Sequence, residues 1–225
     1  MSFDFLFTPV EELDHLIGGL FDGAPLAVAL AVAFLLGLRH ASDPDHLVAV
    51  TSLVAADHGD TRRAAGLGAW WGVGHAGALL ALGIPLIAFK AELPAWLESG
   101  AEKAVGVVIL LLAGRVIYRW ARPRTTHTHR LRTGGQAMSI GLLHGLAGTG
   151  AVVVLLIAAL PSQLESALAL AIFAPMSIVS MTACTAGFAW VLTRPTVEPL
   201  YRTVLIPGLG VFGVMFGLWY AGLGG

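Results

Sequence analysis

A short stretch near residue 40 concentrates metal-binding side chains inside an apolar segment. It runs Arg39-His40-Ala41-Ser42-Asp43-Pro44-Asp45-His46, and apolar residues precede and follow it. Neutral imidazole combined with carboxylate suits divalent transition metals such as nickel, cobalt or zinc, whereas magnesium and calcium favour oxygen ligands alone. The stretch therefore predicts a transition-metal site formed by His40, Asp43, Asp45 and His46.

The proline in this stretch predicts a break in its helix. On an ideal helix His40, Asp43 and His46 share one face, and Asp45 points about 100° away from His46. Pro44 has no N–H to donate to the carbonyl of His40, and its ring clashes there, so the helix should kink or unwind. Such a break can turn Asp45 into the site. Two other uses stay open: a structural ion pair with Arg39, or a proton relay through the same side chains.

Two further histidines lie among small residues in later apolar segments. They occur in Gly74-His75-Ala76-Gly77 and in His144-Gly145-Leu146-Ala147-Gly148. Because glycines let membrane helices approach closely, His75 and His144 are expected as additional ligands or as residues along the path of the ion. The alternative for each is a histidine hydrogen-bonded across helices. Hydroxyls further along are expected to bond to their own helix, namely those of Ser177, Ser180, Thr182 and Thr185.

The composition of the chain indicates a membrane protein. Of its 225 residues, 56% are hydrophobic and 12% charged, and the mean hydropathy is +0.80. A soluble domain does not bury that much apolar surface. The net charge of −1 does not indicate the basic surface that binds nucleic acid. With Cys184 as its single cysteine, the chain cannot form an intrachain disulfide. The expected partners are the lipid bilayer and a metal ion, while the oligomeric state stays open.

Six segments approach the length of about 20 apolar residues that a membrane-crossing helix needs. We therefore expect an all-α integral membrane protein, a single domain over residues 1–225 with about six transmembrane helices. Residues 1–24 are expected to form an amphipathic segment at the membrane surface, with a frayed tail as the alternative. The expected helices span Pro25–Ala55, Gly66–Phe89, Ala101–Trp120, Gln136–Leu160, Ser166–Leu192 and Val204–Leu223.

Basic residues alternate between the links and so predict the orientation. Lys90 and Lys103 fall on one side of the expected membrane, and ten arginines fall on the other, which is the pattern of cytoplasmic loops. Both termini are therefore expected to face away from the cytoplasm, in the cytoplasmic membrane. His127 and His129 lie in the loop 121–135, which we expect to be a solvated basic loop, and their part in metal binding stays open. The ten arginines are Arg62, Arg63, Arg115, Arg119, Arg122, Arg124, Arg130, Arg132, Arg194 and Arg202.

A shift of 104 residues suggests an internal repeat. It lays Gly37-Leu38-Arg39-His40 over Gly141-Leu142-Leu143-His144. The halves 25–120 and 136–225 would then cross the membrane in opposite senses, as a 3+3 inverted repeat typical of secondary transporters. Chance similarity of two Gly/Leu/Val-rich segments is the alternative. A repeat predicts that His144 lies beside the first cluster facing His40, with Gly145, Gly148 and Gly150 packed against the broken helix.

The stretch from Arg39 to His46 resembles the signature of the nickel/cobalt transporter family, Arg-His-Ala-X-Asp-X-Asp-His, at every fixed position. The pair Gly74-His75 resembles the second helix motif of that family. The resemblance implies a permease driven by an ion gradient or the membrane potential. It also implies that the two histidines and two aspartates of the signature form the core of metal recognition. This chain is shorter than those members and has the His144 motif where they carry acidic residues, so it is more similar to compact relatives grouped with urease accessory membrane proteins.

The leading expectation is a secondary transporter of nickel or cobalt, with zinc as a further option, that uses no cofactor and is not an enzyme. One alternative is a membrane partner that delivers metal to nickel enzymes without transport. The other is a membrane metalloenzyme. No His-Glu-X-X-His motif occurs in the sequence, which speaks against a zinc protease. The choice of metal, uptake or efflux, and the coupling ion stay open.

Overall fold

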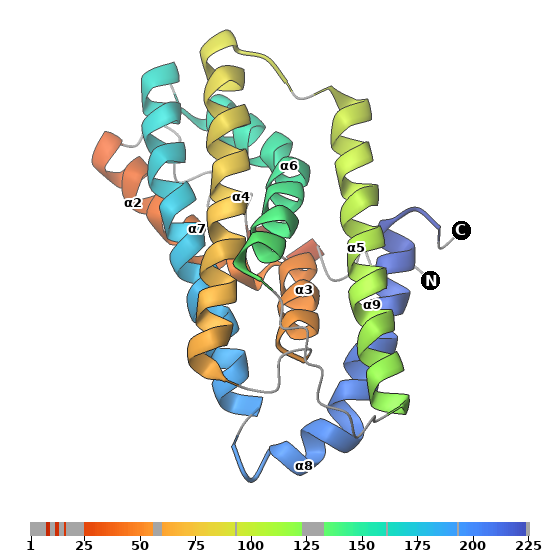
Figure 1. Ribbon diagram of the computed structural model, residues 1–225. Coiled ribbons are helices and arrows are strands. Elements are labelled where there is room, and N and C mark those ends of the chain that lie inside the picture. The colour runs from red at the N-terminus through yellow and green to blue at the C-terminus, as the bar shows by residue number, and fades with distance from the viewer. Residues whose placement is uncertain are drawn as a thin grey trace.

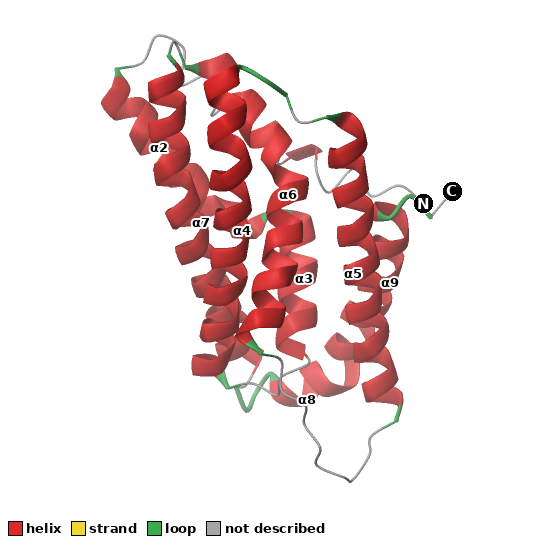
Figure 2. Ribbon diagram, turned by 45° about the horizontal axis from the view of Figure 1, so that its top comes forward, coloured by secondary structure: helices red, strands yellow, loops and turns green. Residues whose placement is uncertain are grey.

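The described part of the chain consists of helices and their connections. The computed structural model describes residues 8, 9, 12, 13, 16, 25–55, 60–92, 94–122, 133–160, 162–192 and 194–223. Figure 2 shows helix and loop but no strand among these residues, which confirms the expected all-α class. The elements are α2 (Leu26–Arg39), the 3-10 helix η2 (His40–Ser42), α3 (Pro44–Ala55), α4 (Thr61–Phe89), α5 (Ala95–Ala121), α6 (Gly134–Ala159), α7 (Gln163–Leu192), α8 (Glu198–Leu200), the π-helix η3 (Tyr201–Leu205) and α9 (Ile206–Tyr220).

Helix α4 lies at the centre of one group of helices in the bundle (Figure 1). It packs against α6 on one side and α7 on the other, and α2 packs against the outer side of α7. The close approach depends on glycines, because a Cβ at Gly72 would overlap Ile178 of α7 and one at Gly74 would overlap the backbone of α6 at Met138. Helices α5 and α9 pack together as a separate pair, and α3 contacts both of these helices.

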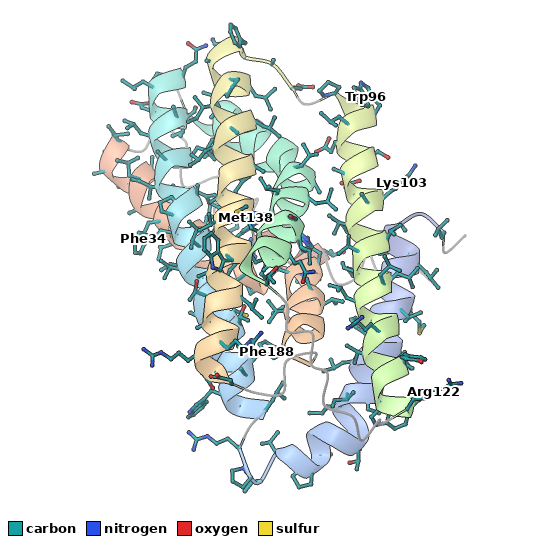
Figure 3. All side chains as sticks on the ribbon, in the orientation of Figure 1. Phe34, Trp96, Lys103, Arg122, Met138 and Phe188 are labelled. Atoms are coloured by element: carbon teal, nitrogen blue, oxygen red, sulfur yellow. The ribbon has the colours of Figure 1, made fainter. Side chains whose placement is uncertain are left out.

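Several helices are long and apolar enough to cross a membrane. Within the described residues three qualify alone, Thr61–Phe89, Gln163–Leu192 and Thr203–Tyr220, and a fourth qualifies if the bent pair Leu26–Ser42 and Pro44–Val50 counts as one span. Each of the six expected segments consists mainly of helix. Large apolar side chains also point outward, as Phe34 does in Figure 3, where lipid would surround them.

The predicted break at Pro44 is confirmed. Helix α2 ends at Arg39 and a single 3-10 turn follows, after which Asp43 is extended at φ −62° and ψ 144° and α3 begins at Pro44. The two helical pieces are bent by 52° relative to each other. The extended conformation of Asp43 is the one that a following proline favours, because the proline ring disfavours the α region for its predecessor.

Ser180 of α7 bridges this break. The expectation that its hydroxyl would bond to its own helix is wrong. Its Oγ donates to the carbonyl of Leu38 at 2.6 Å and accepts from the N–H of Ala41 at 3.1 Å. One hydroxyl thus satisfies two backbone groups that the interrupted helix leaves without helical partners. The expectation of bonding within the same helix is confirmed for the other three residues, Ser177, Thr182 and Thr185.

Replacing Ser180 with alanine is expected to destabilise the protein by about 1–3 kcal/mol, since the N–H of the buried Ala41 loses its acceptor. Thermal unfolding of the purified protein in detergent micelles measures the effect. Ser177→Ala is the matched control, because Ser177 is also buried on α7 but bonds only to the carbonyl of Ala174 on the preceding turn. Equal unfolding temperatures for the two variants would contradict a bridging role.

Two expected features lie outside the described residues. The amphipathic segment 1–24 is described at only a few helical positions between Thr8 and Leu16. The loop carrying His127 and His129 falls within the range 123–132, which is not described.

Candidate metal centre

Four histidines from four different elements converge in the interior of the bundle. They are His40 of η2, His46 of α3, His75 of α4 and His144 of α6, with exposed fractions of 8%, 3%, 0% and 2%. The ring of His46 lies at the centre, with centroids 4.5 Å from His40, 5.2 Å from His75 and 4.9 Å from His144. His40 and His75 also meet, with their Nε2 atoms 2.8 Å apart.

The prediction that His144 lies beside the first cluster is confirmed. Its ring contacts that of His46, and its Nε2 is 3.3 Å from Oδ2 of Asp45. The expected direct facing of His40 and His144 does not occur, because His46 lies between them. The break after Ser42 explains this arrangement: it redirects α3, so that His46 points into the space between the other rings.

The glycines of α6 pack against a different helix from the one expected. A Cβ at Gly141 would overlap the carbonyl of Trp71, and one at Gly145 would overlap the carbonyl of His75, so α6 lies directly on α4. Gly148 has open space around it. The expected packing of the glycines after His144 against the broken helix is therefore corrected: Gly145, together with Gly141 before His144, brings His144 up to α4.

Gly145→Ala is expected to destabilise the protein by about 1–3 kcal/mol and to weaken cobalt binding, because the added methyl group forces α6 away from α4 and displaces His144. The measurements are thermal unfolding in micelles and equilibrium binding of Co²⁺. Gly148→Ala serves as the control on the same helix, since its methyl group would meet no atom within 4 Å. Similar losses in both variants would show that helix propensity, rather than the close approach at His75, governs the effect.

The two aspartates hold the histidines in different ways. Asp45 places Oδ1 3.1 Å from Nδ1 of His46 and Oδ2 3.3 Å from Nε2 of His144. Asp43 lies behind His40, with Oδ2 3.0 Å from Nδ1 of that ring and Oδ1 3.2 Å from Nη1 of Arg39. A carboxylate on the far nitrogen of a histidine fixes the ring and its tautomer, so Asp43 orients Nε2 of His40 towards the other rings.

Several buried polar atoms in this cluster have no hydrogen-bond partner. They are Nε2 of His46, Nδ1 of His75, Nδ1 of His144 and Nε1 of Trp71. The Trp71 ring contacts those of His46 and His144 at centroid distances of 5.5 and 5.7 Å. A buried polar atom without a partner costs about 1–3 kcal/mol, and native proteins contain few of them. Their concentration around one point indicates a site built for a ligand.

The donor atoms fit a metal ion. Two groups of three residues each place one ligand atom within 4.8 Å of the others, His40 with His46 and His75, and Asp45 with His46 and His144. Asp43 belongs to neither group, and its carboxylate contacts Arg39 and His40. Imidazole nitrogens with one carboxylate suit a divalent transition metal rather than magnesium or calcium.

Sequence analysis did not single out Trp71. Its position four residues before His75 places both side chains on the same face of α4, since residues i and i+4 are neighbours on a helix. That spacing was the available signal, and a search of the helical neighbours of each buried histidine would have found it.

The fold and the cluster together define a helical membrane protein with a buried histidine and aspartate site that can hold a metal ion. The chain is 26% identical over 215 residues to the urease accessory protein UreH of Bacillus sp. (strain TB-90), and the match covers 88% of this chain and 92% of that protein. No family model matches the chain, and no solved structure matches it.

Proposed function

We propose that the protein is a secondary transporter of divalent transition-metal ions, nickel or cobalt with zinc as a further option, across the cytoplasmic membrane. The observation that carries the proposal is the buried cluster at a break in an apolar helix, where five side chains form two overlapping groups of ligand atoms that share His46. A discontinuous helix at a substrate site is a recurrent design of secondary transporters.

The ligands in this proposal are His40, Asp45, His46, His75 and His144. Asp43, which the signature placed among the ligands, instead positions His40, because its two oxygens already contact that ring and Arg39. The relative adds support for the metal, since its name makes it an accessory protein of urease, which is a nickel enzyme. The proposal assigns the chain no enzymatic activity and no resident cofactor.

Six crossings and a 3+3 inverted repeat complete the proposal. In such a repeat α6 corresponds to the broken helix α2 and α3, α7 corresponds to α4, and α9 corresponds to α5. The contact of α4 with α6 then has its counterpart in that of α7 with α2, and the contact of α5 with α6 in that of α9 with α3. All four contacts occur. The aligned glycines behave alike as well: a Cβ at Gly37 would overlap α7 at Phe173, and one at Gly141 would overlap α4 at Trp71. Each glycine thus lets the first helix of one half approach the second helix of the other.

The orientation follows from the basic residues. Figure 1 places the beginning of α4, the end of α5 and the end of α7 at the same end of the bundle, and the sequence there carries Arg62, Arg122 and Arg194. Figure 3 shows Arg122 far from Trp96 and Lys103, which lie towards the opposite end of α5. Under the rule that cytoplasmic loops are rich in arginine and lysine, the arginine end faces the cytoplasm and both termini lie outside.

A second candidate function is metal delivery to a nickel enzyme without transport. The name of the relative, a urease accessory protein, favours it. Both candidates need the same ligands, so the site does not separate them, but movement of the ion across a bilayer does.

The deciding experiment reconstitutes the purified chain into sealed proteoliposomes and measures entry of radioactive nickel or cobalt under an imposed membrane potential or proton gradient. Transport predicts uptake well above that of protein-free liposomes, with release on addition of an ionophore. Binding of the metal by the proteoliposomes with no ionophore-releasable fraction would support the delivery function and contradict transport.

A further inference from the structure

The two three-residue groups in the cluster share one residue. His46 belongs both to the group with His40 and His75 and to the group with Asp45 and His144. Its Nδ1 is 3.1 Å from Asp45, and its Nε2 is buried without a hydrogen-bond partner. The remaining members come in two close pairs, with 2.8 Å between the Nε2 atoms of His40 and His75 and 3.3 Å between Asp45 and His144.

These distances describe two neighbouring positions rather than a single cage. Each close pair contacts its own side of the cluster: His40 also contacts Phe173 of α7, whereas His144 contacts Trp71 of α4. A transition-metal ion is bound at about 2.0–2.2 Å from nitrogen or oxygen ligands, so one ion between His40 and His75 uses the first pair, and one between Asp45 and His144 uses the second. Only His46 has ring contacts to members of both pairs.

The two positions differ in charge. Three imidazoles surround the first, whereas the second adds the carboxylate of Asp45. In surroundings of low dielectric constant an opposite charge in direct contact strongly favours a divalent cation. The ion therefore rests at the position with Asp45 and visits the position with three histidines.

We propose that the cluster holds two overlapping positions, occupied in turn by one ion that passes between them while it stays bound to His46. This inference depends on the proposed metal-binding function of the site. A shared ligand has a clear physical advantage, because complete release of a divalent ion from its ligands in the interior of a membrane protein is very costly. Transfer through Nε2 of His46, which has no hydrogen-bond partner, replaces two ligands while the bond to that one nitrogen persists.

The test compares His75→Ala, His144→Ala and the double variant of the full-length protein, purified in detergent, by equilibrium binding of Co²⁺ and by the visible spectrum of the bound ion. The wild type is expected to bind one ion. His75→Ala leaves the resting position intact, so its affinity changes by less than about threefold, while uptake into proteoliposomes falls at least about tenfold. His144→Ala moves the ion to the three histidines, which changes the cobalt spectrum because the carboxylate ligand is lost.

The double variant separates two overlapping positions from one shared cage. With two positions, its affinity falls by more than the product of the two single losses, because each single variant keeps one intact position. With a single five-ligand cage, each substitution weakens binding by a similar factor and the losses multiply; that outcome, or two ions bound to the wild type, overturns the inference. His75→Gln and His144→Gln repeat the comparison with side chains closer in size, and Ser177→Ala controls for a buried polar substitution.

The two proposals can fail separately. If the wild type shows this binding pattern but moves no metal across the bilayer, the two positions stand and the transport function falls. If the wild type transports metal but the affinity loss of the double variant equals the product of the two single losses, transport stands and the proposal of two positions sharing His46 is wrong.

Discussion

Replacement of His46 by alanine is expected to reduce cobalt accumulation in proteoliposomes to the level of protein-free liposomes. His46 is the central ring of the cluster, 97% buried, and it contacts His40, His75, His144 and Asp45. Its removal deletes a ligand and leaves the carboxylate of Asp45 with one histidine partner instead of two. Initial rates of radioactive cobalt uptake measure the effect, and His40→Ala is expected to act in the same direction.

The expected loss must be one of chemistry rather than of folding. The substitution leaves the apolar helices unchanged, so the variant should insert into the membrane and elute from a sizing column like the wild type. Ser177→Ala is the control, since it removes a buried hydroxyl on a neighbouring helix without touching the cluster's ligands. Normal uptake by both His46→Ala and His40→Ala would mean that the site lies elsewhere.

Calcium and magnesium at millimolar concentration are expected to leave cobalt uptake unchanged, whereas nickel competes at micromolar concentration. The cluster offers four imidazoles and one engaged carboxylate, and hard cations bind nitrogen ligands poorly. Competition curves for cobalt uptake, with each cation added outside the vesicles, measure the selectivity. Inhibition by millimolar magnesium as strong as that by micromolar cobalt would contradict a histidine-based site.

The helical segments and the break could be predicted from sequence because both depend on local chemistry. Apolar runs of about 20 residues favour a helix, which satisfies its backbone within one segment in lipid, and Pro44 cannot continue the hydrogen bonding of its helix. What local chemistry does not specify is the partner that stabilises the break. Ser180 lies 139 residues after Ala41, and like Ser177, which bonds to its own helix, it lies among apolar residues of one long segment.

The sequence predicted that the side chains of the cluster would come together, but not how they would be arranged. His40, Asp45, His46, His75 and His144 were all singled out, because polar side chains inside apolar segments are conspicuous. The contacts of Asp43 were not predicted, since an ideal helix places it between His40 and His46, whereas the real chain is extended at that residue and turns its carboxylate to Arg39. Likewise, the repeat placed His144 beside the cluster but could not specify that His46 would lie between it and His40.

The break described at Pro44 also creates two helix ends in the interior of an apolar bundle. Helix α3 starts there with Asp45 in its first turn, where the positive end of the helix dipole stabilises a carboxylate as an anion. Helix α2 ends one turn before, and its last carbonyls contribute partial negative charge on the other side of the gap. The main chain itself therefore contributes fixed partial charges beside Asp45, so that a dehydrating cation meets an electrostatic field that is already in place.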